Sequence, residues 1–433
     1  MALFNGDITG HSGRGEGDGR PLKVLHTSDW HLGRTLGKVK KRHEELSAFL
    51  DWLLKVIDEE GADVLLVAGD VFDSAAPPVE AQALYYNFLG RLRKSRCSHA
   101  VITSGNHDSQ AFLSAPRELL RMMDVHVVSE APDNPQEEIV GLKNEKGELV
   151  LIVAAAPFLK DRVLRKASEG ESIEERDQKI AAGVKDHYET LGVLAAGLKD
   201  GRKIPAVAMG HLFVAGGKTS EGDDERKLYY AGALSGVDPS SFPAVFDYVA
   251  LGHLHAPQRA GSERVRYSGS PIHMSFNEVS GGKGKKSVTL VTFIGTEPLV
   301  KEIEVPVFQE LYTVRGDLNR IRETLDGLKK RDSGAWLDVQ YDSPEPVGDL
   351  KLVLDSLLEG SRMEVLKYNN IRSYEAIFDE SAATKPLKDY TVTEVFDKLM
   401  EKLDVSPAGR DSLKETFNEA LTRFYEESGE SSE

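Results

Sequence analysis

The stretch VLHTSDWHLGR, from Val24 to Arg34, raises the first question about the fold. A short apolar run ends in a carboxylate, Asp29, and an imidazole, His31, follows two residues later. On an extended segment, residues i and i+2 point to the same side. The pair is therefore either surface decoration on a half-buried strand or two ligands of one metal ion, and the rest of the chain has to decide.

Strand-like runs of the same kind recur along the chain. Amphipathic helical patterns at 42–61 and 79–95 separate the first three of them. Strands that alternate with helices of this length predict an α/β domain with a largely covered sheet. The strand-like runs are residues 22–28, 62–70, 99–108, 149–158, 204–211 and 247–255.

The remaining chain predicts three further parts. Residues 1–20 are rich in glycine and are expected to form a flexible tail before the main domain at 21–294. Residues 295–380 read as a small α+β module, and ESAATKP (380–386) reads as a linker. Two amphipathic helices are expected within 387–427, with apolar stripes that could pair with each other, dock on the small module or bind another protein. Binding to another protein is the favoured interpretation.

Composition limits the classes of function. The chain has 433 residues, of which 40% are hydrophobic and 29% charged, as in a globular protein of two or three domains. No apolar run approaches the roughly 20 residues of a membrane span, so no membrane partner is expected. Cys97 is the single cysteine and cannot form an internal disulfide, which favours the cytoplasm.

A formal charge of −16 argues against a free-standing nucleic-acid binder. Three local basic clusters exist, and each is expected to be mainly a solvated face. They are KVKKR (38–42), RLRKSR (91–96) and KGKK (283–286).

Side chains of the kind that bind metals follow the predicted strands one after another. Because the carboxyl ends of adjacent parallel strands meet at one edge of a sheet, these side chains should converge there. Any one cluster alone could be structural, but five in succession favour a metal site. The clusters are Asp29 with His31, Asp70 with Asp73, Asn106 with His107 and Asp108, His211, and His253 with His255.

The residue types indicate the metal chemistry. Asp, Asn and His without cysteine suit Mn²⁺, Fe or Zn²⁺ rather than a sulfur-ligated structural zinc. The set exceeds the needs of one ion, and two ions about 4 Å apart can clamp a phosphate and activate water. Asp70 is the expected bridge between them, because a carboxylate has two oxygens and this one lies in the middle of the series.

The same motifs resemble a known family. The Asp-x-His, Gly-Asp-x-x-Asp, Gly-Asn-His-Asp, Gly-His and Gly-His-x-His motifs match the calcineurin-like metallophosphoesterases. HTSDWHLGR, LLVAGDVFDSAAPP, SGNHDS, ALGHLH and YSGSP followed by SFNE resemble more closely the SbcD family of bacterial nuclease subunits. This resemblance covers residues 22–280 and implies an α/β sandwich with a small α+β capping domain and C-terminal helices.

The resemblance also implies a role for each site residue. His107 would protonate or stabilise the leaving O3′ when water between the ions attacks a phosphodiester. Asp108 is expected to hold its loop, and Asp73 departs from the histidine frequent in relatives, so only a supporting role is assigned to it. One ion would be held by Asp29, His31, Asp70 and His255, and the other by Asp70, Asn106, His211 and His253. The histidines expected to be structural or exposed are His26, His43, His99, His126, His187 and His273.

The function implied by the resemblance is a DNA nuclease in repair and recombination. It would cut duplex ends and hairpins with two divalent ions, Mn²⁺ being the expected one, through contacts to the DNA backbone rather than to bases. Its partner would be a coiled-coil ABC ATPase of the SbcC type, with the nuclease as a homodimer within a heterotetramer.

Two alternatives remain open. A stand-alone phosphatase or cyclic-nucleotide phosphodiesterase would share the metal ligands but would leave residues 295–433 unexplained. A non-catalytic scaffold is disfavoured by the complete ligand set and by His107.

Overall fold

The computed structural model describes most of the chain. The described residues are 20–37, 40–166, 171–217, 236–279, 284–343, 345 and 347–371, together with 396, 413, 414 and 417. They divide into two units, one ending at Tyr312 and the other beginning at Thr313. No helix in these ranges is long and apolar enough to cross a membrane.

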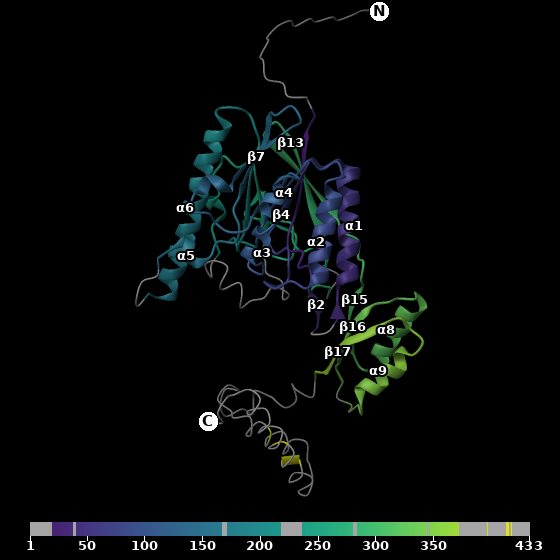
Figure 1. The fold of residues 1–433 in the computed structure, drawn as a ribbon. Helices are drawn as coiled ribbons and strands as arrows, with labels where there is room; N and C mark the ends of the chain where they lie inside the picture. Colours follow the sequence, from purple (N-terminus) through teal and green to yellow (C-terminus); the bar gives the residue numbers. More distant parts are fainter. Residues whose placement is uncertain are drawn as a thin grey trace, which may run out of the picture. The chain divides into compact units, whose positions relative to one another are not determined.

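Two six-stranded sheets make up the first unit within the described residues (Figure 1). In the first sheet, β1, β4, β5 and β6 run parallel, and β13 and β14 are antiparallel to their neighbours. The strands in spatial order are β14 (Glu297–Glu304), β13 (Ser287–Ile294), β1 (Leu22–Thr27), β4 (Val64–Ala68), β5 (His99–Thr103) and β6 (Val125–Val128).

The second sheet has a parallel centre and antiparallel edges. Strands β8, β9, β10 and β12 are parallel, and β7 and β11 pair antiparallel to them. The spatial order is β11 (Gln258–Ala260), β12 (Ser262–Tyr267), β10 (Tyr248–Gly252), β9 (Ala206–His211), β8 (Leu149–Ala155) and β7 (Ile139–Lys143).

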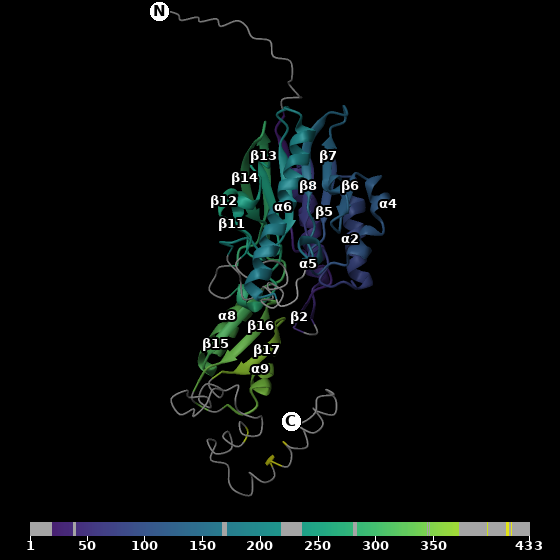
Figure 2. The same ribbon diagram turned by 90° about the vertical axis from the view of Figure 1, so that its left-hand side faces the viewer.

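Helices cover the outer faces of the two sheets (Figure 2). Helices α1 (His43–Glu60) and α2 (Val79–Leu92) pack on the first sheet, and α6 (Ile173–Lys199) packs on the second. The stripe of Leu46, Phe49 and Leu53 faces inward on α1, and the helix ends at Gly61, whose φ of 67° is a left-handed conformation that glycine adopts readily. Short elements complete the unit: β2 (Thr35–Leu36), β3 (Lys40–Lys41), α3 (Gln110–Ser114), α4 (Arg117–Arg121) and α5 (Asp161–Leu164).

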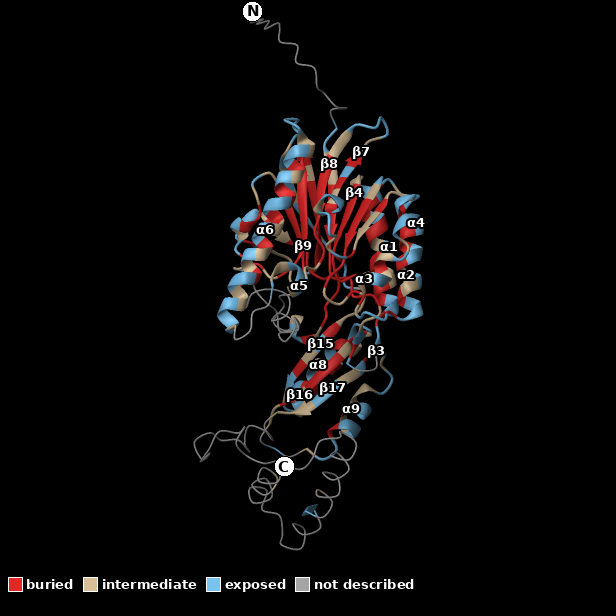
Figure 3. Ribbon diagram, turned by 60° about the vertical axis from the view of Figure 1, so that its left-hand side comes forward, coloured by how far each residue is buried: buried red, intermediate tan, exposed pale blue. Residues whose placement is uncertain are grey.

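A third apolar layer lies between the two sheets. Val64 and Leu66 of β4 belong to the same buried cluster as Val207 and Met209 of β9. Strands covered on both faces need continuous apolar runs, which is what VLLVA in β4 provides. Figure 3 shows the buried residues concentrated in the strands and the exposed residues on the outer faces of the helices.

The α/β sandwich expected from the sequence is confirmed, and the structure adds the assignment of each strand to one of two sheets. The six strand-like runs all form strands, but they belong to two sheets: the first three runs lie in one sheet and the last three in the other. The hydrophobic pattern alone did not show which sheet each strand joins, because the strands of both sheets are apolar.

The second unit is a small α+β module with its own core. Its three-stranded sheet packs against two helices, with Ile321, Leu325, Leu337 and Leu354 buried between them. The elements are β15 (Leu311–Gly316), α8 (Leu318–Lys330), β16 (Trp336–Tyr341), α9 (Leu350–Leu358) and β17 (Glu364–Asn370).

The division between the units falls later in the chain than expected. The sequence places it after residue 294, whereas the structure places it between Tyr312 and Thr313. The reason is that β14 (Glu297–Glu304) pairs along its whole length with β13 and so completes the first sheet.

The predicted C-terminal helices at 387–427 lie outside the described residues except for four positions. Phe396 and Phe417, one from each predicted stripe, are stacked with ring centroids 4.0 Å apart and an interplanar angle of 12°. At this point the two stripes therefore contact each other, which is one of the three arrangements considered from the sequence.

Two leucines of α9 test the separate core of the second unit. Leu354 is 1% exposed and Leu352 is 66% exposed. Leu354→Ala should lower the free energy of unfolding of this unit by about 2–5 kcal/mol, because it leaves a cavity. Leu352→Ala should change it by no more than about 0.5 kcal/mol. Urea denaturation followed by circular dichroism measures both, and equal effects of the two variants would contradict the described core.

Candidate metal centre

All seven predicted ligands lie at the carboxyl ends of five strands. Asp29 and His31 follow β1, Asp70 follows β4 and Asn106 follows β5, all in the first sheet. The second sheet contributes His211, the last residue of β9, and His253 and His255 after β10. The two sheets therefore contribute to one cluster.

Main-chain hydrogen bonds continue the pairing of β1 and β4 beyond the sheet. The amide N–H groups of Asp29 and His31 donate to the carbonyl oxygens of Gly69 and Asp70, each at 3.0 Å. The N–H of Leu32 donates to the carbonyl of Val71 at 2.9 Å. The two ligand-bearing loops are thus held side by side by their backbones.

Four of the ligand residues have a left-handed backbone. The φ angles are 52° at Asp29, 47° at His31, 48° at Asp70 and 103° at His253. They are four of the seven non-glycine residues with positive φ in the described part of the chain. Each such conformation costs about 1–3 kcal/mol and persists where the surroundings impose it, typically at functional sites.

Asp70 lies between the histidines of both sheets. Its Oδ2 is 3.6 Å from His31 Nε2 and 3.4 Å from His211 Nε2. Its Oδ1 accepts the backbone N–H of His107 at 2.9 Å. One oxygen of Asp70 therefore faces both histidines while the other holds a loop, and its role as a bridge between two ions stays a prediction.

The other donor atoms converge on either side of Asp70. His31 Nε2 and His255 Nε2 are 3.2 Å apart, and Asn106 Oδ1 lies 3.1 Å from His211 Nε2 and 3.2 Å from His253 Nδ1. Among the histidine, cysteine, aspartate and glutamate side chains of the described residues, three sets have donor atoms no more than 4.8 Å apart. These are Asp29, His31 and His255; Asp29, Asp70 and His211; and His31, Asp70 and His107.

Burial keeps three of the imidazoles in the neutral form that binds metals. It lowers the pKa of His253 to about 3, lowers the pKa of His31, and lowers the pKa of His255 well below its usual value. For His211, burial acts in the same direction and is the largest single effect, but the charge and hydrogen bond of Asp70, together with the charge of Asp29 and the carbonyl of Ala68, outweigh it and raise the pKa to about 9.

The carboxylates of the cluster are also shifted. Burial raises the pKa of Asp29 to about 7. Burial opposes ionisation of Asp70 as well, but His211 and the neighbouring histidines lower its pKa well below the usual value.

This donor set fits two divalent ions. Two buried carboxylates are costly unless positive charge balances them, and oxygen and nitrogen donors without sulfur suit Mn²⁺, Fe or Zn²⁺.

Asp108 ties the loops of the first sheet together. Its carboxylate accepts the backbone N–H groups of Val71 at 3.1 Å, Phe72 at 2.8 Å and Gly105 at 2.8 Å. These bonds correspond to the loop-holding role expected from the sequence. They also connect the loop that carries Asp70 to the loop that carries Asn106.

His107 and Asp73 lie on the more open side of the cluster. His107 is only partly buried, and its Nδ1 donates to the carbonyl oxygen of Asp73 at 2.9 Å. The carboxylate of Asp73 is 3.2 Å from His31 Nδ1 and 2.8 Å from Arg34 Nη1. Asp73 therefore contacts the ring nitrogen of His31 that faces away from Asp70, which agrees with the supporting role expected of it.

Sequence reasoning missed two buried residues beside the cluster. Lys286 and Glu278 form an ion pair of 2.6 Å next to His255. Lys286 was expected on a solvated face as part of KGKK, but it is 6% exposed. The motif SFNE at 275–278, which contains Glu278, was the available signal, although it entered only as part of the resemblance.

Four of the histidines expected to be structural or exposed have hydrogen-bond partners among the described residues, and His273, which donates to the carbonyl oxygen of Gly284, is one of them. His26 is buried against the Tyr248 hydroxyl at 3.0 Å, and His187 contacts Glu138 at 2.9 Å. His99 donates to the carbonyl oxygen of Lys143 at 2.8 Å.

Comparison with known protein families agrees with the geometry. Residues 22–257 match the calcineurin-like phosphoesterase family, and residues 307–403 match the type 5 capsule protein repressor C-terminal domain. Together the two matches cover parts of both units.

Several known proteins, each named as the D component of the nuclease SbcCD, are similar over most of this chain. The one from Escherichia coli strain K12 is 35% identical over 406 residues, which cover 92% of this chain and 98% of the relative. The protein of the same name in Rhodobacter capsulatus is 34% identical, covering 78% of this chain and 84% of the relative. That of Bacillus subtilis is 32% identical, covering 74% and 78%.

Gly105 provides a test of the central position of Asp70. A Cβ at Gly105 would overlap the Asp70 carboxylate. Gly105→Ala should therefore displace Asp70 and lower the amount of Mn²⁺ bound at both of the two expected metal positions. Elemental analysis after metal loading and desalting measures that amount. Gly90→Ala in α2 is the control, since a Cβ there meets no atom within 4 Å. Full metal content in Gly105→Ala would show that Asp70 does not serve both positions.

Proposed function

Because the chain belongs to the SbcD family of nuclease subunits and carries a calcineurin-like phosphoesterase domain, we propose that it hydrolyses phosphodiester bonds at duplex DNA ends and hairpins together with an SbcC-type ATPase. The enzyme is a metal-dependent nuclease. We propose duplex DNA as the substrate and Mn²⁺ as the metal. We also propose an SbcC-type ATPase as the partner and the cytoplasm as the location.

One observation carries the proposal: Asp70 lies between two groups of donor atoms. On one side are Asp29, His31 and His255, and on the other are Asn106, His211 and His253. We assign one divalent ion to each group, with Asp70 shared. When bound, such a pair of ions neutralises phosphate charge and activates water for attack.

The side chains of the chain itself supply positioning and proton transfer. His107 donates through Nδ1 to the carbonyl of Asp73, which fixes the orientation of the ring and assigns proton transfer to Nε2. Its partial exposure, unlike the burial of the ligand histidines, suits a group that reaches the substrate. We therefore assign protonation of the leaving O3′ to His107.

The net charge of −16 remains consistent with a DNA substrate if a partner supplies much of the DNA-binding surface. The names of the SbcD relatives describe one component of a nuclease complex. A stand-alone phosphatase or cyclic-nucleotide phosphodiesterase is the weaker alternative, because similarity to those relatives extends through the second unit.

Two substrates distinguish these functions. The purified chain, alone and with an SbcC-type ATPase, is incubated with linear duplex DNA and with bis-p-nitrophenyl phosphate in the presence of Mn²⁺ or Mg²⁺. The nuclease proposal expects cleavage of both substrates. Hydrolysis of the small ester without DNA cleavage, even with the ATPase present, would favour the phosphodiesterase.

His107→Gln tests the assignment of the general acid. Loss of one proton-transfer group should lower turnover by roughly 10²–10⁴-fold. The bound metal content should stay at the wild-type value, because His107 is not assigned as a ligand. A loss of metal in this variant would instead place His107 among the ligands, a role that its distance from His31 and Asp70 also permits.

The C-terminal segment is proposed to hold the ATPase, with the nuclease as a homodimer in a heterotetramer. A chain ending at Pro386 should fold, bind two metal ions and hydrolyse bis-p-nitrophenyl phosphate at the wild-type rate. It should no longer co-purify with an SbcC-type ATPase, because the apolar stripes that include Phe396 and Phe417 are removed. Undiminished co-purification would move the attachment to another part of the chain.

A further inference from the structure

A buried ion pair lies directly behind His255. Lys286 Nζ is 2.6 Å from Glu278 Oε2, and the two side chains are 6% and 4% exposed. Burial of such a pair carries a desolvation penalty that offsets much of the attraction, so the pair is weak evidence for stability. Its position beside a predicted ligand therefore calls for another explanation.

Lys286 holds the main chain of His255. Its ammonium group donates to the carbonyl oxygen of His255 and to Ser270 Oγ, each at 2.8 Å, in addition to Glu278. These three partners use all three donors of a lysine. The backbone N–H of Ser270 donates to the same carbonyl at 3.1 Å, and Ser270 Oγ lies 3.4 Å from it.

Glu278 faces the ring of His255 from the side opposite to the cluster. His255 Nε2 is directed at His31 Nε2, 3.2 Å away, while Nδ1 lies 3.9 Å from Glu278 Oε1. The other oxygen of Glu278 is held by Lys286 and by the backbone N–H of Met274 at 3.1 Å. At 3.9 Å this contact is electrostatic rather than a hydrogen bond, and the negative charge on that side favours a proton on Nδ1, which leaves Nε2 to bind metal.

We propose that Glu278 and Lys286 are positioning residues that orient His255 and thereby set the affinity of one of the two metal positions. The position affected is the one assigned to Asp29, His31 and His255. The position of Asn106, His211 and His253 has no comparable contact with the pair in the described residues. The inference rests on the proposed two-metal site.

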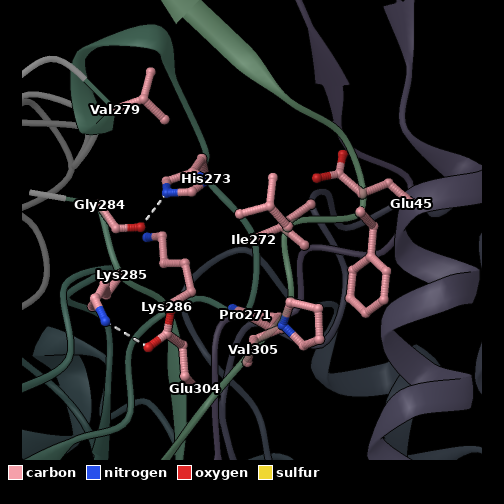
Figure 4. Close-up of a pocket in the computed structure, with 13 residues that line it drawn as sticks. Glu45, Pro271, Ile272, His273, Val279, Gly284, Lys285, Lys286, Glu304 and Val305 are labelled. Carbon is pink, nitrogen blue, oxygen red and sulfur yellow. Dashed lines mark hydrogen bonds and ion pairs between the residues drawn. The ribbon is translucent and has the colours of Figure 1, made fainter. Parts of the chain in front are cut away.

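Lys286 lies beside a cavity, which makes substitution of the buried pair easier to accommodate. Lys286 lines a cavity of about 250 Å³ together with Ile272, His273 and Val305 (Figure 4). Water can enter a cavity of this size where polar groups are available, so water can occupy the space next to residue 286 when the ammonium group is removed.

Titration of the metal-free full-length chain with Mn²⁺ tests the proposal, with free Mn²⁺ followed by electron paramagnetic resonance. The wild type should show two binding steps. Glu278→Gln and Lys286→Met should weaken one step by roughly 10–100-fold, the usual effect of removing a group that orients a metal-binding histidine. The other step should remain unchanged.

A second buried pair provides the matched control. Arg42 and Glu45 are 2.7 Å apart, with side chains 0% and 6% exposed, and neither is assigned as a metal ligand or contacts one in a described ion pair. Glu45→Gln should lower thermal stability but leave both Mn²⁺ affinities at their wild-type values.

The double variant Glu278→Gln with Lys286→Met separates positioning from stability. It leaves no unpaired charge, so its melting temperature should exceed that of the less stable single variant, while the weakened Mn²⁺ step should remain weak. Recovery of both properties would show that the pair is only structural. Unchanged affinities in folded Glu278→Gln, equal weakening of both steps, or the same selective loss in Glu45→Gln would also overturn the inference. A wild-type chain that binds no Mn²⁺ would contradict the proposed function itself.

Discussion

The buried carboxylate of Asp70 is the constraint on which the site depends. It is 2% exposed and lies between His31 of one loop and His211 at the end of a strand in the other sheet. A carboxylate removed from water is costly unless opposite charge and hydrogen bonds compensate. His211 supplies the charge in this structure, and the backbone N–H of His107 supplies a hydrogen bond.

The backbone around Asp70 shows how that position is maintained. The left-handed φ at Asp29, His31 and Asp70 is unfavourable locally, so it must be imposed by the rest of the fold. The hydrogen bonds between the loops after β1 and β4 impose it from one side. The carboxylate of Asp108, with its three backbone donors, holds the loop of Asp70 from the other side.

The face-to-face packing of the sheets fixes the strand ends from which these loops start. Because the apolar layer between the sheets includes residues of β4, β9 and β10, the carboxyl ends of these strands cannot shift independently. The carboxylates of Asp73 and Glu278 then lie behind individual ligand histidines. The structure thus has a packed scaffold, the predicted ligands at its edge and acidic groups that face the outer nitrogens of two of the predicted ligand histidines.

The sequence by itself determined the elements and the residue types of the site. Apolar runs and amphipathic patterns located the strands and helices that carry the ligands, because burial on two faces or on one stripe leaves a local signal. The order of Asp, Asn and His after successive strands, together with the family resemblance, indicated a two-metal phosphoesterase. These features are local, so no tertiary information was needed to find them.

Only the tertiary structure decided how these parts combine. The pairing of β14 with β13 moved the end of the first unit to Tyr312, since strand partners are chosen across the fold and leave no local pattern. Lys286 is buried because Glu278 and the carbonyl of His255 are its partners. Neither partner is visible in the sequence KGKK, which therefore predicted a solvated basic cluster. The single oxygen of Asp70 that faces both histidines is likewise a result of packing two sheets together, because Asp70 and His211 lie far apart in the chain and meet only where the ends of β4 and β9 coincide.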